Sequence, residues 1–316
     1  GILHLFPILM PIRFFLQCVG WSLPILVGLL VYIGIHRDTF PAPRLTANIA
    51  VNEQVHRLAL LPTTQVDILA IGSSMTLNNL ATAPVLDHFG TTSYQNAAAW
   101  GIGAAELERY APVLIRHFRP RQVIVVTNMV DLQRGSPMGA ADTASISAHL
   151  RSKGGPSTYL RHWNMPYYLR QMETNRIRFS DPGNYEYLGY DAHGASTLEV
   201  PKALIDQGRF NEVPPRMADL DTARIAAFAR FARYLRQEQV ELLVFCSPYR
   251  DGLRTSTVEA DAAAYATLLR AIVEPHGHRL VNGYEMHWPD DLFCDASHMD
   301  HAGADAFTRW CLSKME

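Results

Sequence analysis

The most apolar part of the chain lies near its N-terminal end. Phe14 to Ile35 contains no charged side chain. As a helix rising 1.5 Å per residue, this run would be about 33 Å long, enough to cross the apolar core of a bilayer. A cleaved signal peptide is the main alternative, but its apolar region usually covers only about 7–15 residues. We therefore predict an uncleaved single-pass membrane anchor within residues 1–38. Its orientation is barely decided by charge, because Arg13 and Arg37 flank the run almost symmetrically.

Beyond the anchor, short apolar runs alternate with segments of helical spacing. A linker and a helix are expected at residues 39–63, where Pro41 and Pro43 precede helical spacing at Asn48–Leu60. Strands are predicted at Val66–Ile71, Ser93–Asn96, Val123–Thr127, Val240–Cys246 and Arg279–Val281. Helices are predicted at Asn78–His88, Ala104–His117, Leu220–Gln237 (capped by Asp219 or Asp221), Ala262–Glu274 (capped by Asp261) and Ala302–Leu312. This alternation indicates an α/β domain over residues 64–316, with a parallel sheet between two layers of helices.

One long stretch interrupts this alternation. The segment at about 133–217 has few periodic runs and many Gly, Pro, Ser and Tyr residues. It is too long for a plain loop in a compact domain. We predict an inserted subdomain there. Its aromatic residues either pack the insert or line a groove for a glycan; they are Tyr159, Trp163, Tyr167, Tyr168, Tyr185, Tyr187 and Tyr190.

Composition excludes several classes of protein. The 316 residues carry a formal net charge of −2 and no polybasic stripe, which argues against nucleic-acid binding. The four cysteines form no CxxC motif, so a zinc knuckle or a thioredoxin-type site is not supported. A disulfide between Cys294 and Cys311 stays open, since spacing alone does not show proximity. His276 and His278 are expected to be exposed.

Candidate chemistry lies where predicted strands end. The first strand runs into Gly72-Ser73-Ser74, and a serine at the start of a helix meets backbone N–H groups that favour negative charge. Many such turns carry Gly and Ser only as caps, so this turn is a weak signal by itself.

A second candidate is the segment from Asp295 to His301. An aspartate three residues before His298 can reach the ring Nδ1, which leaves the other ring nitrogen to take a proton from a serine. A metal site built from Asp295, His298, Asp300 and His301 is the less favoured alternative, because adjacent residues of one loop rarely converge on one ion.

The third candidate is Asn96 to Gly101, where a glycine after a strand lets the backbone approach a ligand. Together the three blocks resemble the SGNH (GDSL-like) serine hydrolases and acyltransferases, in the order Gly-x-Ser, Asn-x-x-x-x-Gly and Asp-x-x-His. The resemblance covers about Val66 to Trp310. It implies a flavodoxin-like three-layer fold and catalysis without a metal or another cofactor.

The resemblance also assigns roles. Ser74 would be the nucleophile, with Ser73 as the fallback, His298 the general base and acid, and Asp295 the group that orients His298. Backbone N–H groups of Ser74 and Gly101 would form the oxyanion hole.

The family's third block, Gly-x-Asn-Asp, is not preserved. If Asp131 aligns with its aspartate, Val130 replaces the asparagine that donates to the oxyanion, although Asn128 could reach the site from another register.

This departure, the anchor and the long insert look like the membrane-anchored acyl-transfer branch, which includes the D-alanyl transfer protein of teichoic acid operons and alginate O-acetylation proteins. Loose matches at Tyr185–Gly194 and at Ser247-Pro248-Tyr249-Arg250 point the same way. Tyr249 and Arg250 would then bind substrate, or else finish a strand and bind carboxylates locally.

The branch implies an enzyme of the cytoplasmic membrane whose catalytic domain faces the periplasm or the exterior. It would transfer an acyl group, expected to be acetyl, to a polysaccharide, with a membrane-bound O-acyltransferase as the source of the acyl donor. Two alternatives remain: an esterase or deacetylase with the same triad, and a non-catalytic partner of a membrane acyltransferase or polysaccharide synthase.

Overall fold

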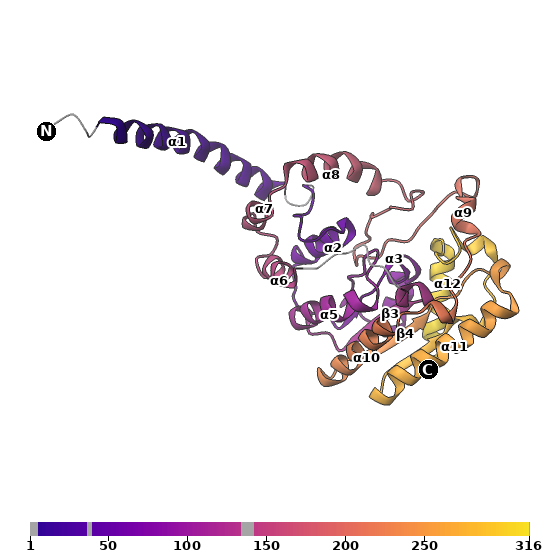
Figure 1. The fold of residues 1–316 in the computed structure, drawn as a ribbon. Coiled ribbons are helices and arrows are strands. Elements are labelled where there is room, and N and C mark those ends of the chain that lie inside the picture. The colour runs from indigo at the N-terminus through magenta and orange to yellow at the C-terminus, as the bar shows by residue number, and fades with distance from the viewer. Residues whose placement is uncertain (1–5, 37–39, 134–141, 316) are drawn as a thin grey trace.

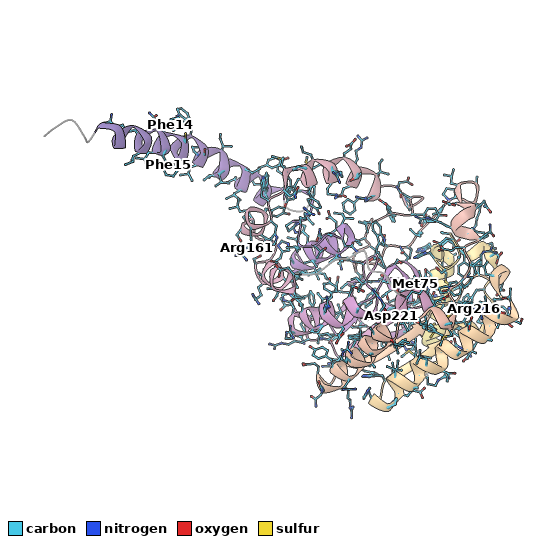
Figure 2. All side chains as sticks on the ribbon, in the orientation of Figure 1. Phe14, Phe15, Met75, Arg161, Arg216 and Asp221 are labelled. Carbon is cyan, nitrogen blue, oxygen red and sulfur yellow. The ribbon has the colours of Figure 1, made fainter. Side chains whose placement is uncertain are left out.

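The N-terminal helix stands apart from the rest of the chain. The computed structural model describes residues 6–36, 40–133 and 142–315. Helix α1 (Phe6–Ile35) projects from the domain (Figure 1). Within these residues, one helix is long and apolar enough to cross a membrane, over Ile12–Ile35. Only 6% of its most apolar stretch is buried against the rest of the chain. Figure 2 shows Phe14 and Phe15 on its exposed surface. The predicted apolar helix is therefore present.

The sheet has five parallel strands in the order β2-β1-β3-β4-β5. They are β1 (Ile68–Ala70), β2 (Tyr94–Asn96), β3 (Gln122–Thr127), β4 (Glu241–Cys246) and β5 (Arg279–Asn282). Because all strands are parallel, their carboxyl ends meet at one edge, which is where doubly wound folds bind ligands. This sheet confirms the predicted α/β fold, and its order is the flavodoxin-like one.

Helices cover both faces of the sheet. Alternate residues point to opposite sides of a strand, so Leu69 and Val125 join one apolar cluster while Ile68 and Val126 join the other. The first face is covered by α2 (Ile49–Ala59), α5 (Ala104–Phe118), α10 (Thr222–Gln237) and α11 (Ser256–Val273). The second is covered by α3 (Ser74–Asn79), α4 (Thr82–Phe89) and α12 (His301–Ser313). The three layers agree with the expected architecture.

Two predicted helices differ from the structure. The helix expected over Asn78–His88 is two helices, α3 and α4, separated at Leu80 and Ala81. The break lets Ala81 N donate to Thr308 Oγ1 at 3.0 Å, which ties this point to α12.

The helix expected to begin after Asp261 begins six residues earlier, at Ser256, and Thr255 is its cap. Asp261 instead pairs with Arg216.

The segment between β3 and α10 contains helices and turns. Its elements are η1 (Met129–Leu132), α6 (Thr143–Arg151), α7 (Ser157–Arg161), α8 (Met165–Arg178), η2 (Lys202–Leu204), α9 (Gln207–Phe210) and η3 (Met217–Asp219). Tyr159 and Tyr168 are buried in one cluster with Ile33, so the insert packs against the end of α1. Two predicted features lie outside the described residues: the anchor boundary at residues 38–39 and insert residues 134–141.

Short 3-10 turns complete the second half of the chain at η4 (Asp251–Leu253), η5 (Glu274–His276), η6 (Gly283–Glu285) and η7 (Asp290–Leu292). Cys294 and Cys311 are free, buried thiols in different apolar clusters, so the disulfide left open by the sequence does not form. The expectation that His278 is exposed is wrong. Its ring is buried between Leu242 N, which donates to Nδ1, and the carbonyl of Ala232.

Candidate active site

The turn after β1 presents Ser74 at the carboxyl edge of the sheet. Gly72 has a φ of +153°, and a Cβ there would lie 2.3 Å from Thr76 Oγ1, so only glycine fits the turn. Ser73 caps α3: its Oγ accepts from Met75 N and donates to Asp131 Oδ2 at 3.0 Å. Ser73 is thereby engaged in holding the turn, and Ser74 is the serine turned toward His298.

A loop before α12 brings the second and third groups to the serine. His298 Nε2 lies 2.9 Å from Ser74 Oγ, and His298 Nδ1 lies 2.7 Å from Asp295 Oδ2. The other carboxylate oxygen, Oδ1, accepts the backbone N–H groups of Ser297 and His298 at 2.9 and 2.7 Å. With Asp295 ionised, Nδ1 carries the proton, and Nε2 of neutral His298 is free to accept from Ser74.

The charges of this pair stabilise each other. Burial raises the pKa of Asp295, but the neighbouring His298 and the hydrogen bonds from His298 and Ser297 outweigh burial, so the pKa lies below its usual value. Burial lowers the pKa of His298, but the charge and hydrogen bond of Asp295 outweigh it, so this pKa lies above its usual value. The arrangement therefore favours an imidazolium next to an ionised carboxylate, the state that forms when a serine gives up its proton.

Asn79, which the sequence analysis did not single out, holds the serine and histidine segments together. It is the last residue of α3, and its side chain is fully buried. Its Nδ2 donates to the carbonyl of Ser297 at 2.9 Å and to Ser247 Oγ at 2.8 Å, while its Oδ1 accepts from Met299 N at 2.9 Å. The amide therefore contacts the backbone on both sides of His298.

The loop from Asn96 to Gly101 reaches the site through Trp100, which lines the pocket at Ser74. Asn96 Nδ2 donates to the carbonyl of Thr76 in α3 at 3.0 Å, and its Oδ1 accepts from Ala98 N at 2.9 Å. Gly101 has a left-handed φ of 68° directly after Trp100. The turn that the predicted block needs is present, while the oxyanion role of the Gly101 and Ser74 N–H groups stays a prediction.

Asn128 does not point into this pocket. Its side chain is fully buried under α3, where Oδ1 accepts from Val130 N at 3.0 Å and Nδ2 contacts Met75 Sδ at 3.1 Å. The amide is thus used to cap η1 and to pack against Met75. The structure therefore does not place Asn128 as the oxyanion donor that the alternative register would have supplied.

The pocket at Ser74 is a cavity of about 220 Å³. Besides Ser74, Asp295 and His298, it is lined by Asn78, Trp100, Tyr185, Glu186, Leu198 and Arg209. The Arg209 guanidinium lies 4.6 Å from the ring centre of Tyr185, and Tyr185 Oη donates to the carbonyl of Cys294 at 2.7 Å. Tyr185 was among the aromatic residues considered for a glycan groove. Arg209 and Asn78 were missed, because neither lies in a recognisable motif.

Tyr249 and Arg250 lie outside the Ser74 pocket. Tyr249 is buried and borders a neighbouring cavity together with Val130 and Ser297. The Arg250 guanidinium is paired with Asp290 and donates to the carbonyl of Phe210 at 2.8 Å. The structure thus favours the alternative in which Arg250 binds a carboxylate locally, since its charge is engaged away from the pocket.

The four residues of the alternative metal site do not converge. Asp300 caps α12 through Gly303 N and lies 3.5 Å from Lys202 Nζ, while His301 Nδ1 lies 3.0 Å from Thr197 Oγ1. Among the described residues, no group of three or more His, Cys, Asp or Glu side chains could hold a metal ion.

Neither a protein-family model nor a curated protein matches the chain. Among solved structures, a mutant of an acetyl-xylooligosaccharide esterase from Geobacillus is similar at 11% identity and a TM-score of 0.42, covering 80% of this chain and 95% of that one. A GDSL-like lipase from Bacteroides thetaiotaomicron is similar at 11% identity and a TM-score of 0.40, covering 84% and 98%. Overlaps of this quality do not establish a shared family.

Proposed function

We propose that the chain is a membrane-anchored serine enzyme that transfers an acyl group to hydroxyls of a cell-envelope or secreted polysaccharide. The observation that carries this proposal is the continuous contact from Asp295 through His298 to Ser74, at 2.7 and 2.9 Å. Such an arrangement activates a serine hydroxyl that has no unusual reactivity alone.

The reaction would proceed in two halves. Ser74 Oγ attacks the acyl carbonyl carbon while His298 Nε2 takes its proton, and His298 then returns that proton to the leaving oxygen, which leaves an acyl-serine. In the second half, a sugar hydroxyl loses its proton to His298 and attacks the same carbonyl carbon. The bond to Ser74 Oγ then breaks, and His298 returns the proton to Ser74 Oγ, so the sugar ester leaves and the free enzyme is restored. The backbone N–H groups of Ser74 and Gly101 are the proposed donors to the oxyanion in both halves.

The choice of a polysaccharide acceptor and an acetyl group rests on the sequence resemblance to the membrane-anchored acyl-transfer branch. The same resemblance supports a membrane-bound O-acyltransferase as the source of the acyl donor. The apolar α1 supports attachment to a membrane. We place the catalytic domain on the periplasmic or outer side of the cytoplasmic membrane, and an alkaline phosphatase fusion after Lys314 would test this, because that reporter is active only outside the cytoplasm.

Water in place of the sugar hydroxyl would make the chain an esterase. Purified full-length protein should be supplied with an acetyl ester, with and without an acetyl-free oligosaccharide. Acetylated oligosaccharide formed by the wild type but not by Ser74→Ala supports transfer, whereas release of acetate alone supports hydrolysis. Glycan acylation in cells that is unchanged by Ser74→Ala would contradict the proposed mechanism altogether.

A further inference from the structure

A second, larger cavity lies away from the Ser74 pocket, beside the end of the apolar helix α1. It measures about 750 Å³ and opens between α2 and α8. Phe40, Leu60, Met172 and Phe179 form its apolar walls. The Phe40 ring lies 5.5 Å from that of Tyr168, which packs in one cluster with Ile33 of α1. This cavity, called the anchor-side cavity below, therefore adjoins the foot of the apolar helix.

Its wall contains a carboxyl group with an unused oxygen. Glu53 is 7% exposed, and its Oε1 accepts from Asn175 Nδ2 at 2.9 Å and from Ala42 N at 3.3 Å. Within the described residues, Glu53 Oε2 has no hydrogen-bond partner. Asn175 lines the same wall and leaves its buried Oδ1 unpaired too. A ligand group that donates hydrogen bonds, such as a protonated amine, would satisfy the free oxygen of Glu53.

The rim carries the opposite charge. Arg176 lines the cavity, its side chain is exposed, and among the described residues its guanidinium makes no ion pair. A guanidinium in this position suits a phosphate group. The cavity thus presents the Glu53 carboxyl group inside and the Arg176 cation at its mouth, which complements a head group carrying an ammonium beyond a phosphate. The Arg57 guanidinium also lines the cavity, but it already donates to Gln54, Gln95 and the carbonyl of Asn96.

An apolar track leads from the cavity toward α1. Met165, Leu169 and Met172, here called the α8 stripe, lie on one face of α8 at spacings of four and three residues. They are 48%, 61% and 53% exposed. Met172 belongs to the cavity, and Met165 begins the helix at the end that packs near Phe40 and Ile33. Lipid chains placed along this stripe would remain continuous with the lipid around α1.

We propose that the anchor-side cavity binds an aminophospholipid of the membrane, with its ammonium at Glu53, its phosphate at Arg176 and its acyl chains along the α8 stripe. The site is separate from the Ser74 pocket, and its occupancy does not depend on the activity proposed above. Phosphatidylethanolamine has the required groups. Phosphatidylcholine has the same phosphate but no N–H donor, and phosphatidylglycerol lacks the amine. Comparing the three head groups therefore separates the contribution of the ammonium N–H groups to binding from that of the phosphate.

The test uses the full chain in phosphatidylglycerol nanodiscs. Each sample is doped with one probe, which is phosphatidylethanolamine, phosphatidylcholine or phosphatidylglycerol carrying a diazirine in an acyl chain. After irradiation, peptides from α8 are quantified by mass spectrometry. We expect about tenfold more labelling of the α8 stripe with the phosphatidylethanolamine probe than with the phosphatidylcholine probe, the ratio that one charge-assisted hydrogen bond provides. Equal labelling by the two probes would overturn the proposal.

Variants locate the recognition. Glu53→Gln keeps an acceptor for Asn175 and should remove the preference for phosphatidylethanolamine. Arg176→Glu, at an exposed position that should not disturb folding, should weaken labelling by all three probes. Met172→Trp should block the mouth, while Leu204→Trp, at an exposed apolar side chain of η2, is the matched control. A preference for phosphatidylethanolamine that survives Glu53→Gln, or labelling unchanged by both Arg176→Glu and Met172→Trp, would show that the cavity does not bind the head group.

Discussion

Asn79 offers a sharp test of how the fold assembles the site. Its amide contacts the carbonyl of Ser297 and the N–H of Met299, and so fixes the backbone on both sides of His298. Asn79→Ala removes both contacts and the one to Ser247 Oγ, and leaves buried backbone groups unpaired. Each unpaired group costs about 1–3 kcal/mol, so we expect a loss of about 2–5 kcal/mol in the free energy of unfolding.

Asn79→Ala should also slow the reaction of Ser74, beyond what the loss of stability alone would cause. A shift of His298 by about 1 Å can reduce the rate of a positioned reaction about 100-fold. Asn52→Ala is the matched control: Asn52 is also fully buried, and it hydrogen-bonds Thr46 and Tyr167 away from the site. Both variants should lose stability in chemical denaturation, measured in mild detergent. Only Asn79→Ala should slow fluorophosphonate labelling per folded molecule. Wild-type labelling rates in both variants would refute the idea that Asn79 positions His298.

Three further predictions address the charges and the turn. Asp295→Asn removes the charge that raises the pKa of His298, so the acid limb of the rate against pH should move to lower pH while the rate falls about 10⁴-fold; a limb that stays in place would contradict the pairing. Gly72→Ala places a Cβ against Thr76 and should cost at least about 2 kcal/mol in thermal or chemical unfolding, whereas Gly90→Ala, with open space around it, should cost less. Burial raises the pKa of Glu53 from 4.5 to about 7, so the native state keeps a proton that the unfolded chain releases; stability should fall by about 3 kcal/mol as pH rises through that window, and Glu53→Gln should lack that contribution in urea titrations.

The parts of the site that the sequence could predict are those set by local geometry. Asp295 and His298 are three residues apart, and one short loop brings their side chains into contact. The Gly72-Ser73-Ser74 turn follows from a buried strand running into a helix. Both features depend on neighbouring residues, so spacing and residue type were sufficient to propose them.

The parts that could not be predicted depend on distant contacts. The break between α3 and α4 is stabilised by Thr308, more than 200 residues away in the chain, and Asn79 meets the His298 loop over a similar separation. His278 was expected to be exposed, but backbone groups of β4 and α10 enclose its ring. Arg250 was expected near the pocket because it follows a strand, but its guanidinium pairs with Asp290 and donates to the carbonyl of Phe210, away from Ser74. Helical spacing carries no information about such partners.

The central claim is that Ser74 is an activated nucleophile. Intact-mass analysis of the full chain after treatment with a fluorophosphonate tests it most directly, alongside Ser74→Ala and Ser73→Ala. We predict a single adduct on the wild type and on Ser73→Ala, and none on Ser74→Ala. A folded wild-type protein that stays unlabelled in native membranes, or an adduct that persists in Ser74→Ala, would contradict the account.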